Sequence, residues 1–244
     1  MNARLDAEVQ AEVQAVLAAL EQLGSQKILD EMRTRYGIPV DKGFGVPMAA
    51  MQKVAKRHGR NHELALALWD TGWYEARTVA ALVDDPASVT AAQMDRWCRD
   101  FDNWAICDTV CFKLFDQTPH AFRKVEQWAS RRGEFVRRGA FALLACLALH
   151  DKQAGDDAFV RCLLLVEEGA GDERNFVKKA VSWALRAIGG RSPELHTATV
   201  ALARRLAASS EAAPRWVGKD VLKDLTRPAV TQRMETRRAT ASRS

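Results

Sequence analysis

The chain has 244 residues, of which 48% are hydrophobic and 27% charged, a composition typical of a soluble globular protein with an apolar core. No apolar run reaches the roughly 18 residues of a transmembrane helix, and the acidic start lacks the basic residues and apolar stretch of a signal peptide. We therefore expect a cytoplasmic protein that does not associate with membranes.

The net charge of +5 is concentrated at one end of the chain. The segment from Arg227 onward holds five arginines and one glutamate, so the rest of the sequence is nearly neutral. A short stretch rich in Arg, Thr and Ser favours disorder, and we predict a basic, disordered tail over 226–244. Such a tail can be a solvated terminus, which the composition favours, or it can contact phosphate groups.

The cysteines give no sign of a disulfide framework or a metal site. Their number is odd, no CxxC pair occurs, and Cys107 and Cys111 have no second pair at zinc-site spacing. The five histidines are scattered as well. We expect buried, reduced thiols, no metal and no cofactor.

Helical signals run through the whole sequence. Asn61, Thr90 and Asp172 each precede a helical pattern as N-cap residues, and either Asp102 or Asn103 does the same. The pattern predicts about 13 helices in chain order, over 5–23, 26–36, 47–58, 62–71, 74–83, 91–101, 104–115, 120–132, 134–150, 156–168, 173–188, 193–208 and 216–225. Connections this short favour antiparallel neighbours.

One internal repeat is visible in this helical array. Phe135–Ala140 resembles Phe176–Val181, 41 residues later, and this spacing is typical of the helix pairs of HEAT and armadillo proteins. Stacked helix pairs line a concave surface on which equivalent residues of successive repeats become neighbours. We therefore predict one all-α, HEAT-like solenoid domain over 1–225, with a basic band along its groove. The band would consist of Arg137, Arg138, Lys178, Lys179 and Arg186.

The segment Phe101–Asp108 carries the strongest chemical signal. Trp104 and Asp108 are four residues apart, so they share one face of the predicted helix. A carboxylate among apolar residues needs a partner or a function, and an ion pair with an arginine of a neighbouring helix is the simplest interpretation. Trp183 lies in a basic helix, where it can equally be a core residue.

Two upstream features have structural interpretations. Gly43–Pro47 has two glycines but no preceding strand and no third glycine at nucleotide-binding spacing, so we expect a loop that sets the first repeat. We expect Glu75 and Arg77 either to pair with neighbouring helices or to brace the groove.

Several of these motifs, in this order, resemble the AlkD-type DNA alkylation repair proteins. The resemblance extends from about Tyr36 to about Leu225. It rests on the motifs Trp69–Arg77, Asn103-Trp104 with Asp108, Phe135–Arg138 and Asn175–Arg186. Phe135 departs from the family pattern, which often has a tryptophan at this position.

The resemblance implies both a fold and an activity. It implies HEAT-like helix pairs around duplex DNA, and N-glycosylase action on cationic alkylpurines such as 3-methyladenine and 7-methylguanine without base flipping. Asp108 matches the catalytic aspartate of the family. Trp104 and Trp183 match its groove-facing tryptophans, and Arg138 matches its DNA-contacting arginine.

Three functions remain open on the sequence alone. The first is a monomeric alkylpurine DNA glycosylase. The second is a DNA-binding member without excision of simple lesions, since some paralogues lack the activity. The third is a helical-repeat scaffold for proteins or RNA, because a fold does not fix a function.

Overall fold

The computed structural model describes residues 3–241 and is entirely helical over that range, so the prediction of an all-α fold is confirmed. The chain forms two compact units, Met1–Pro119 and His120–Ser244, and each is described by itself. None of the helices within 3–241 is long and apolar enough to cross a bilayer. The single domain predicted over 1–225 stays a prediction.

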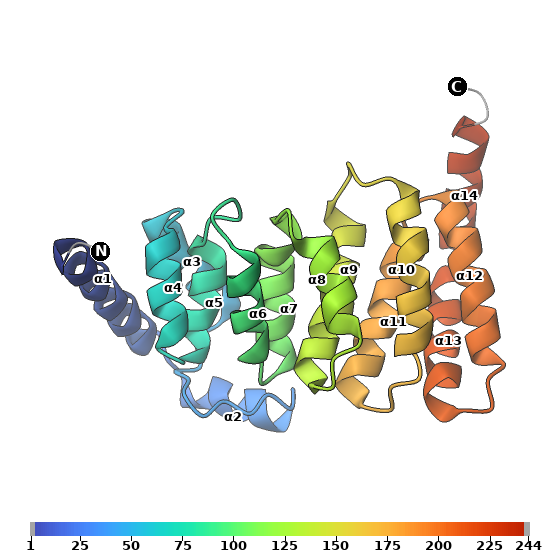
Figure 1. Ribbon diagram of the computed structural model, residues 1–244. Coiled ribbons are helices and arrows are strands. Elements are labelled where there is room, and N and C mark those ends of the chain that lie inside the picture. Colours follow the sequence, from blue (N-terminus) through green and yellow to red (C-terminus); the bar gives the residue numbers. More distant parts are fainter. Residues whose placement is uncertain (1–2, 242–244) are drawn as a thin grey trace. The chain divides into compact units, whose positions relative to one another are not determined.

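The first unit contains seven α-helices and a short 3-10 helix (Figure 1). They are α1 (Ala3–Gln22), α2 (Gln26–Thr34), α3 (Met48–His58), α4 (His62–Asp70), α5 (Tyr74–Val83), α6 (Ala91–Arg99), α7 (Trp104–Lys113) and η1 (Phe115–Gln117). Helix α5 packs between α3 and α7, and it also packs on α4. In Figure 1, α2 runs crosswise below the ends of α4 to α7.

The second unit consists of regular helix pairs followed by one more helix. Its helices are α8 (Ala121–Ala129), α9 (Glu134–His150), α10 (Asp156–Gly169), α11 (Asn175–Gly189), α12 (Pro193–Ala207), α13 (Ala212–Leu225) and α14 (Pro228–Ala241). Within this unit α9, α11 and α13 form one layer, and α8, α10 and α12 form the other (Figure 1). Such a double layer is the arrangement that a stack of helix pairs produces.

Local capping explains where many of these helices begin. The side chains of Asn61, Thr90 and Asn103 each accept a hydrogen bond from the backbone N–H three residues later, as predicted. Asn103, not Asp102, is thus the cap of α7. The cap assigned to Asp172 is wrong, because α11 begins after Arg174 and Asp172 binds arginine side chains instead.

The tail predicted over 226–244 differs from the structure over most of its length. Residues Pro228–Ala241 form α14, which packs on α12 and α13. Its one apolar anchor is Met234, which is 4% exposed. Arg237 donates to the backbone oxygens of Gly190 and Arg191, and Arg238 donates to the hydroxyl of Thr197. The arginines that suggested disorder therefore dock this helix, and the last three residues of the predicted tail lie outside the described part.

The core fills both units with apolar side chains, and all five cysteines are buried, as expected. Two helices approach each other closely at Gly218 of α13. A Cβ atom at this position would lie 2.3 Å from the nitrogen of Ala207 and 2.5 Å from the oxygen of Ala203, both backbone atoms of α12. No side-chain rearrangement can relieve such contacts.

We predict that Gly218→Ala lowers the free energy of unfolding by about 1–3 kcal/mol, because overpacking outweighs the higher helix propensity of alanine. Chemical denaturation measures this change. Gly171→Ala is the matched control, since its Cβ would meet nothing closer than an oxygen at 3.6 Å. Equal stability of the two variants would contradict the close approach of α12 and α13.

Candidate active site and nucleic-acid contacts

The candidate catalytic segment is the first turn of α7, in the first unit. The cap at Asn103 starts the helix, so Trp104 and Asp108 lie one turn apart on one face, and both are partly exposed. The indole N–H of Trp104 donates to the backbone oxygen of Tyr36 at 3.0 Å. This hydrogen bond ties the ring to the segment that follows α2.

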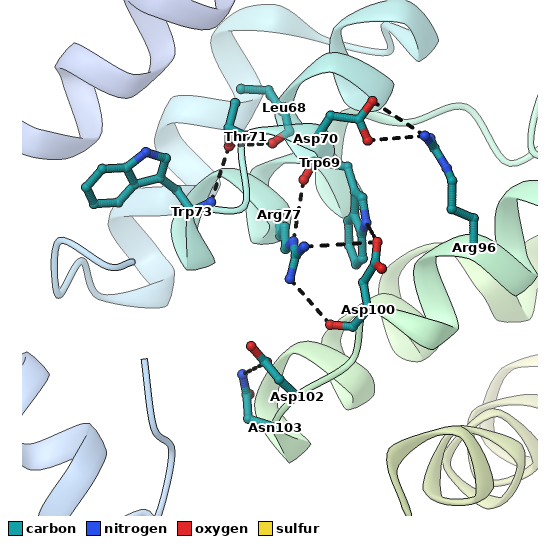
Figure 2. A network of polar contacts seen from close by, with 10 residues as sticks. All are labelled: Leu68, Trp69, Asp70, Thr71, Trp73, Arg77, Arg96, Asp100, Asp102 and Asn103. Carbon is teal, nitrogen blue, oxygen red and sulfur yellow. Dashed lines mark hydrogen bonds and ion pairs between the residues drawn. The ribbon is translucent and has the colours of Figure 1, made fainter. Parts of the chain in front are cut away.

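The turn that leads into α7 is held by Arg77 of α5 (Figure 2). Its guanidinium donates to the backbone oxygens of Trp69 and Asp100 at 3.4 and 3.3 Å, and it lies 4.0 Å from the Asp100 carboxylate. The same carboxylate accepts the indole N–H of Trp69 at 2.8 Å. Because Trp69 also stacks on Trp97 of α6, with ring centroids 4.0 Å apart, the network joins four elements.

Glu75 holds the glycine-containing loop that precedes α3. Its side chain is fully buried, and its carboxylate accepts the backbone N–H groups of Phe44, Gly45 and Val46 at 3.0, 2.7 and 3.2 Å. Three N–H donors satisfy a buried carboxylate without a cation. The loop is thereby fixed, as predicted for Gly43–Pro47, but the ion pair considered for Glu75 is absent among the described residues.

A cavity of about 260 Å³ lies beside the start of α7. It is lined by Pro39, Val40, Asp41, Lys42, Gly72, Tyr74, Arg77, Asp102, Asn103 and Ile106. Burial raises the pKa of Tyr74 to about 12, and the charges of Glu75 and Asp102 act in the same direction. The phenol therefore stays protonated at neutral pH and presents a hydrogen-bond donor.

In the second unit, the two copies of the repeat lie side by side on α9 and α11. The rings of the equivalent residues Phe135 and Phe176 are 5.4 Å apart. Arg138 is only 6% exposed and donates to the backbone oxygen of Phe176 at 2.6 Å. The predicted adjacency of equivalent repeat residues is thus confirmed, whereas Arg138 lies mostly inside the packed layer.

Arg137 also points into a local network. Its guanidinium contacts the carboxylate of Asp172 at 3.1 Å, and Arg174 contacts the same carboxylate at 2.5 Å. The hydrogen bonds from Arg174 hold the pKa of the Asp172 carboxyl below its ordinary value, against the effect of burial. Arg137 is therefore largely neutralised.

The remaining predicted contact residues lie along α11. Lys179 is exposed, and Lys178 places its ammonium 4.9 Å from the ring centre of Trp216 on α13. Trp183 and Arg186 are partly exposed, and Arg186 donates only to Ser182 of its own helix, at 3.4 Å.

The structure thus brings together Trp104 with Asp108 in one unit, and the repeat-related residues of α9 and α11 in the other. Of the residues of the predicted basic band, Arg137 and Arg138 are engaged within the unit, whereas Lys178 and Lys179 are more accessible. The sequence pattern missed Tyr36 as a partner of Trp104. A backbone oxygen carries no residue-type signal, so only the fold reveals it.

Comparison with sequence models of protein families shows to which family the chain belongs. The sequence model described as DNA alkylation repair enzyme matches residues 16–225. The chain belongs to this family. The family resemblance inferred from the separated motifs is therefore confirmed over most of the chain.

A solved structure supports the fold of this family member. It belongs to a protein described as part of "a new family of proteins related to the HEAT-like repeat DNA glycosylases with affinity for branched DNA structures". The TM-score is 0.71 at 21% identity, with 86% of this chain and 94% of that chain covered. The fold is thus HEAT-like. Comparison with curated protein sequences gives no significant match.

We predict that Arg77→Lys lowers the free energy of unfolding by about 1–3 kcal/mol, because an ammonium cannot reproduce the forked contacts of the guanidinium. Arg96→Lys is the matched control. Arg96 pairs with Asp70 at 3.1 Å, but both side chains are well exposed, so we expect a change below about 0.5 kcal/mol. Thermal or urea unfolding distinguishes the two, and equal losses would contradict the bracing role.

A second prediction concerns how the stability of the fold depends on pH. Because the pKa of Asp172 is lowered in the folded state, its ionised form stabilises the fold at neutral pH, and this contribution is lost as the pH falls below about 4. Asp172→Asn should therefore be less stable at pH 7 and should lose less stability on acidification. Asp224→Asn, which removes an exposed pair with Arg227, should leave the acid profile unchanged. Urea unfolding at several pH values tests this, and identical wild-type and Asp172→Asn profiles would refute it.

Proposed function

We propose that this protein is a DNA glycosylase that removes cationic alkylated purines, such as 3-methyladenine and 7-methylguanine, from duplex DNA. The observation that carries the proposal is the joint presentation of Trp104 and Asp108 on one partly exposed face of α7. Membership of the DNA alkylation repair family supports it.

Asp108 is assigned the electrostatic and acid–base role. An N3- or N7-alkylated purine is positively charged, so it leaves with the electrons of the C1′–N bond as a neutral base. Positive charge then moves to the deoxyribose, where a fixed carboxylate stabilises the oxocarbenium-like transition state. Water attacks C1′, and the same carboxylate orients this water and accepts its proton.

Trp104 is assigned to the wall of this site. Its indole is held at one edge by the hydrogen bond to Tyr36, which leaves a rigid aromatic face for the nucleotide. An indole face attracts cationic character with about 0.5–2 kcal/mol. This interaction grows with charge on the sugar and needs no extrusion of the base, in keeping with excision without base flipping.

The second unit is assigned to DNA contact. Lys178, Lys179 and Arg186 are accessible enough to meet phosphates, and Trp183 offers a second partly exposed indole. Arg138 reaches DNA only at its exposed edge, and the pairing of Arg137 with Asp172 makes it the weakest member of the predicted set. We propose that the protein acts as a monomer.

We predict that Asp108→Asn lowers the single-turnover rate of 7-methylguanine release by about 10²–10³-fold. Its affinity for the duplex should be equal or higher, because a charge that repels phosphates is removed. Asp70→Asn is the matched control, since this exposed carboxylate of the same unit contacts only Arg96, and its rate should equal that of the wild type.

The outcomes separate the proposed function from its competitors. Unchanged excision by Asp108→Asn would refute the mechanism. Salt-dependent duplex binding without base release over a panel of methylated and bulky lesions would indicate a DNA-binding protein without excision activity. Absence of duplex binding by the wild type would favour a scaffold for other partners.

A further inference from the structure

The second unit contains a large basic cavity, of whose residues the proposed function uses only Arg186. It measures about 630 Å³ and lies where the end of α9, the α11–α12 connection and α14 meet. Its lining includes Lys152, Arg186, Arg191, Arg233 and Arg237, with Asp156 as the one carboxylate. Five cations in one hollow give a strongly positive potential, and the N-terminus of α12 at Pro193 adds to it.

The carboxylate in this cavity does not neutralise the cations. Asp156 accepts a short hydrogen bond from the hydroxyl of Ser192, the cap of α12. Within residues 3–241, Lys152, Arg186, Arg233 and Arg237 form no ion pair with any aspartate or glutamate. A protein that gathers unpaired cations in this way loses free energy by mutual repulsion unless an anion binds.

Two of the arginines are structural and form the fixed floor of the cavity. Arg191 donates to the backbone oxygens of Ala148, Asp151 and Ala154 at 2.7–2.9 Å and lies 4.1 Å from the ring centre of Phe159. Arg237 donates to the backbone oxygen of its neighbour Arg191 at 2.9 Å. The hydrogen bonds of both guanidiniums go to neutral backbone oxygens, and the charges of Asp156 and Asp151 act on Arg191 without an ion pair to it among the described residues.

The side chains of two other cations, Lys152 and Arg233, do not hold protein segments together in this way. The side chain of Arg233 has no hydrogen bond or ion pair to another described residue, and among these residues the ammonium of Lys152 donates only to the backbone oxygen of Leu149. They belong to α14 and to the segment after α9, and both line the same cavity. Flexible cations above a rigid cationic floor suit an anion with several oxygens, such as a phosphate group.

We propose that this cavity of the second unit is a further DNA-contact site, which holds a backbone phosphate and recruits α14 to DNA binding. The proposal rests on the proposed function in one respect, since DNA is taken as the source of the phosphate. It does not depend on excision. Its ligand is the phosphodiester, so the contact is independent of base sequence.

The test compares duplex affinity over a range of salt concentrations, by fluorescence anisotropy with an unmodified labelled duplex. Each lost phosphate contact lowers the slope of log Kd against log salt by about 0.9. The double variant Lys152→Gln with Arg233→Gln removes the contact to one phosphate and should therefore lose up to about 0.9 from the slope. Its Kd then rises roughly three- to fourfold less than that of the wild type between 50 and 200 mM salt.

The matched control removes two charges elsewhere in the same unit. Arg161 and Arg204 are exposed on α10 and α12 and lie outside the cavity, and their side chains have no hydrogen bond or ion pair to another described residue. Their double glutamine variant should keep the wild-type slope. Thermal unfolding of both double variants checks that the fold is retained, and Arg233→Glu provides a second variant with a larger expected loss.

Two results would overturn the proposal. The first is a wild-type slope for the cavity variant, and the second is an equal loss in the control. In the first case, lost binding of that variant to phosphatidylglycerol vesicles would assign the cavity to a membrane surface. If the wild type binds DNA with the expected slopes but releases no base, the proposed function fails and this site stands.

Discussion

The forked contact of Arg77 is the constraint on which the candidate catalytic segment depends. One guanidinium fixes the end of α4 and the turn after α6, and that turn carries the cap from which α7 starts. The direction of Trp104 and Asp108 is set by this start. The same helix, α5, also carries the fully buried Glu75, which fixes the loop before α3. One short helix therefore holds both that loop and the turn before α7, next to the 260 Å³ cavity.

Basic residues have two distinct uses in the second unit. Arg138, Arg174 and Arg191 bind backbone oxygens or a buried carboxylate and so hold helix ends together. Such side chains are costly to move, since a buried charge without partners is strongly unfavourable. Lys179 and Arg233 have no such partner and can meet a ligand at little cost. Net charge alone therefore overstates how much of this surface is available to DNA.

Much of the fold could be predicted from local patterns, because helix periodicity, the caps at Asn61 and Thr90 and the two repeat copies can each be recognised within a short segment of sequence. The motif around Asp108 could be recognised for the same reason. Contacts between distant segments could not: Asp172 looks like a cap but binds Arg137, 35 residues away. The composition of the tail likewise concealed α14, whose order depends on one methionine and on arginine contacts to the α11–α12 segment.

The contact between Phe135 and Phe176 has a consequence for how the second unit loses its structure. Each helix pair packs on the next, so cooperativity passes from neighbour to neighbour instead of through one central nucleus. The end of such an array has a neighbour on one side only, and opening starts there. Hydrogen exchange should accordingly be faster in α14 than over residues 138–148 of α9, which are all buried. The helix of this pair that opens more easily is then the one that carries Arg233 and Arg237.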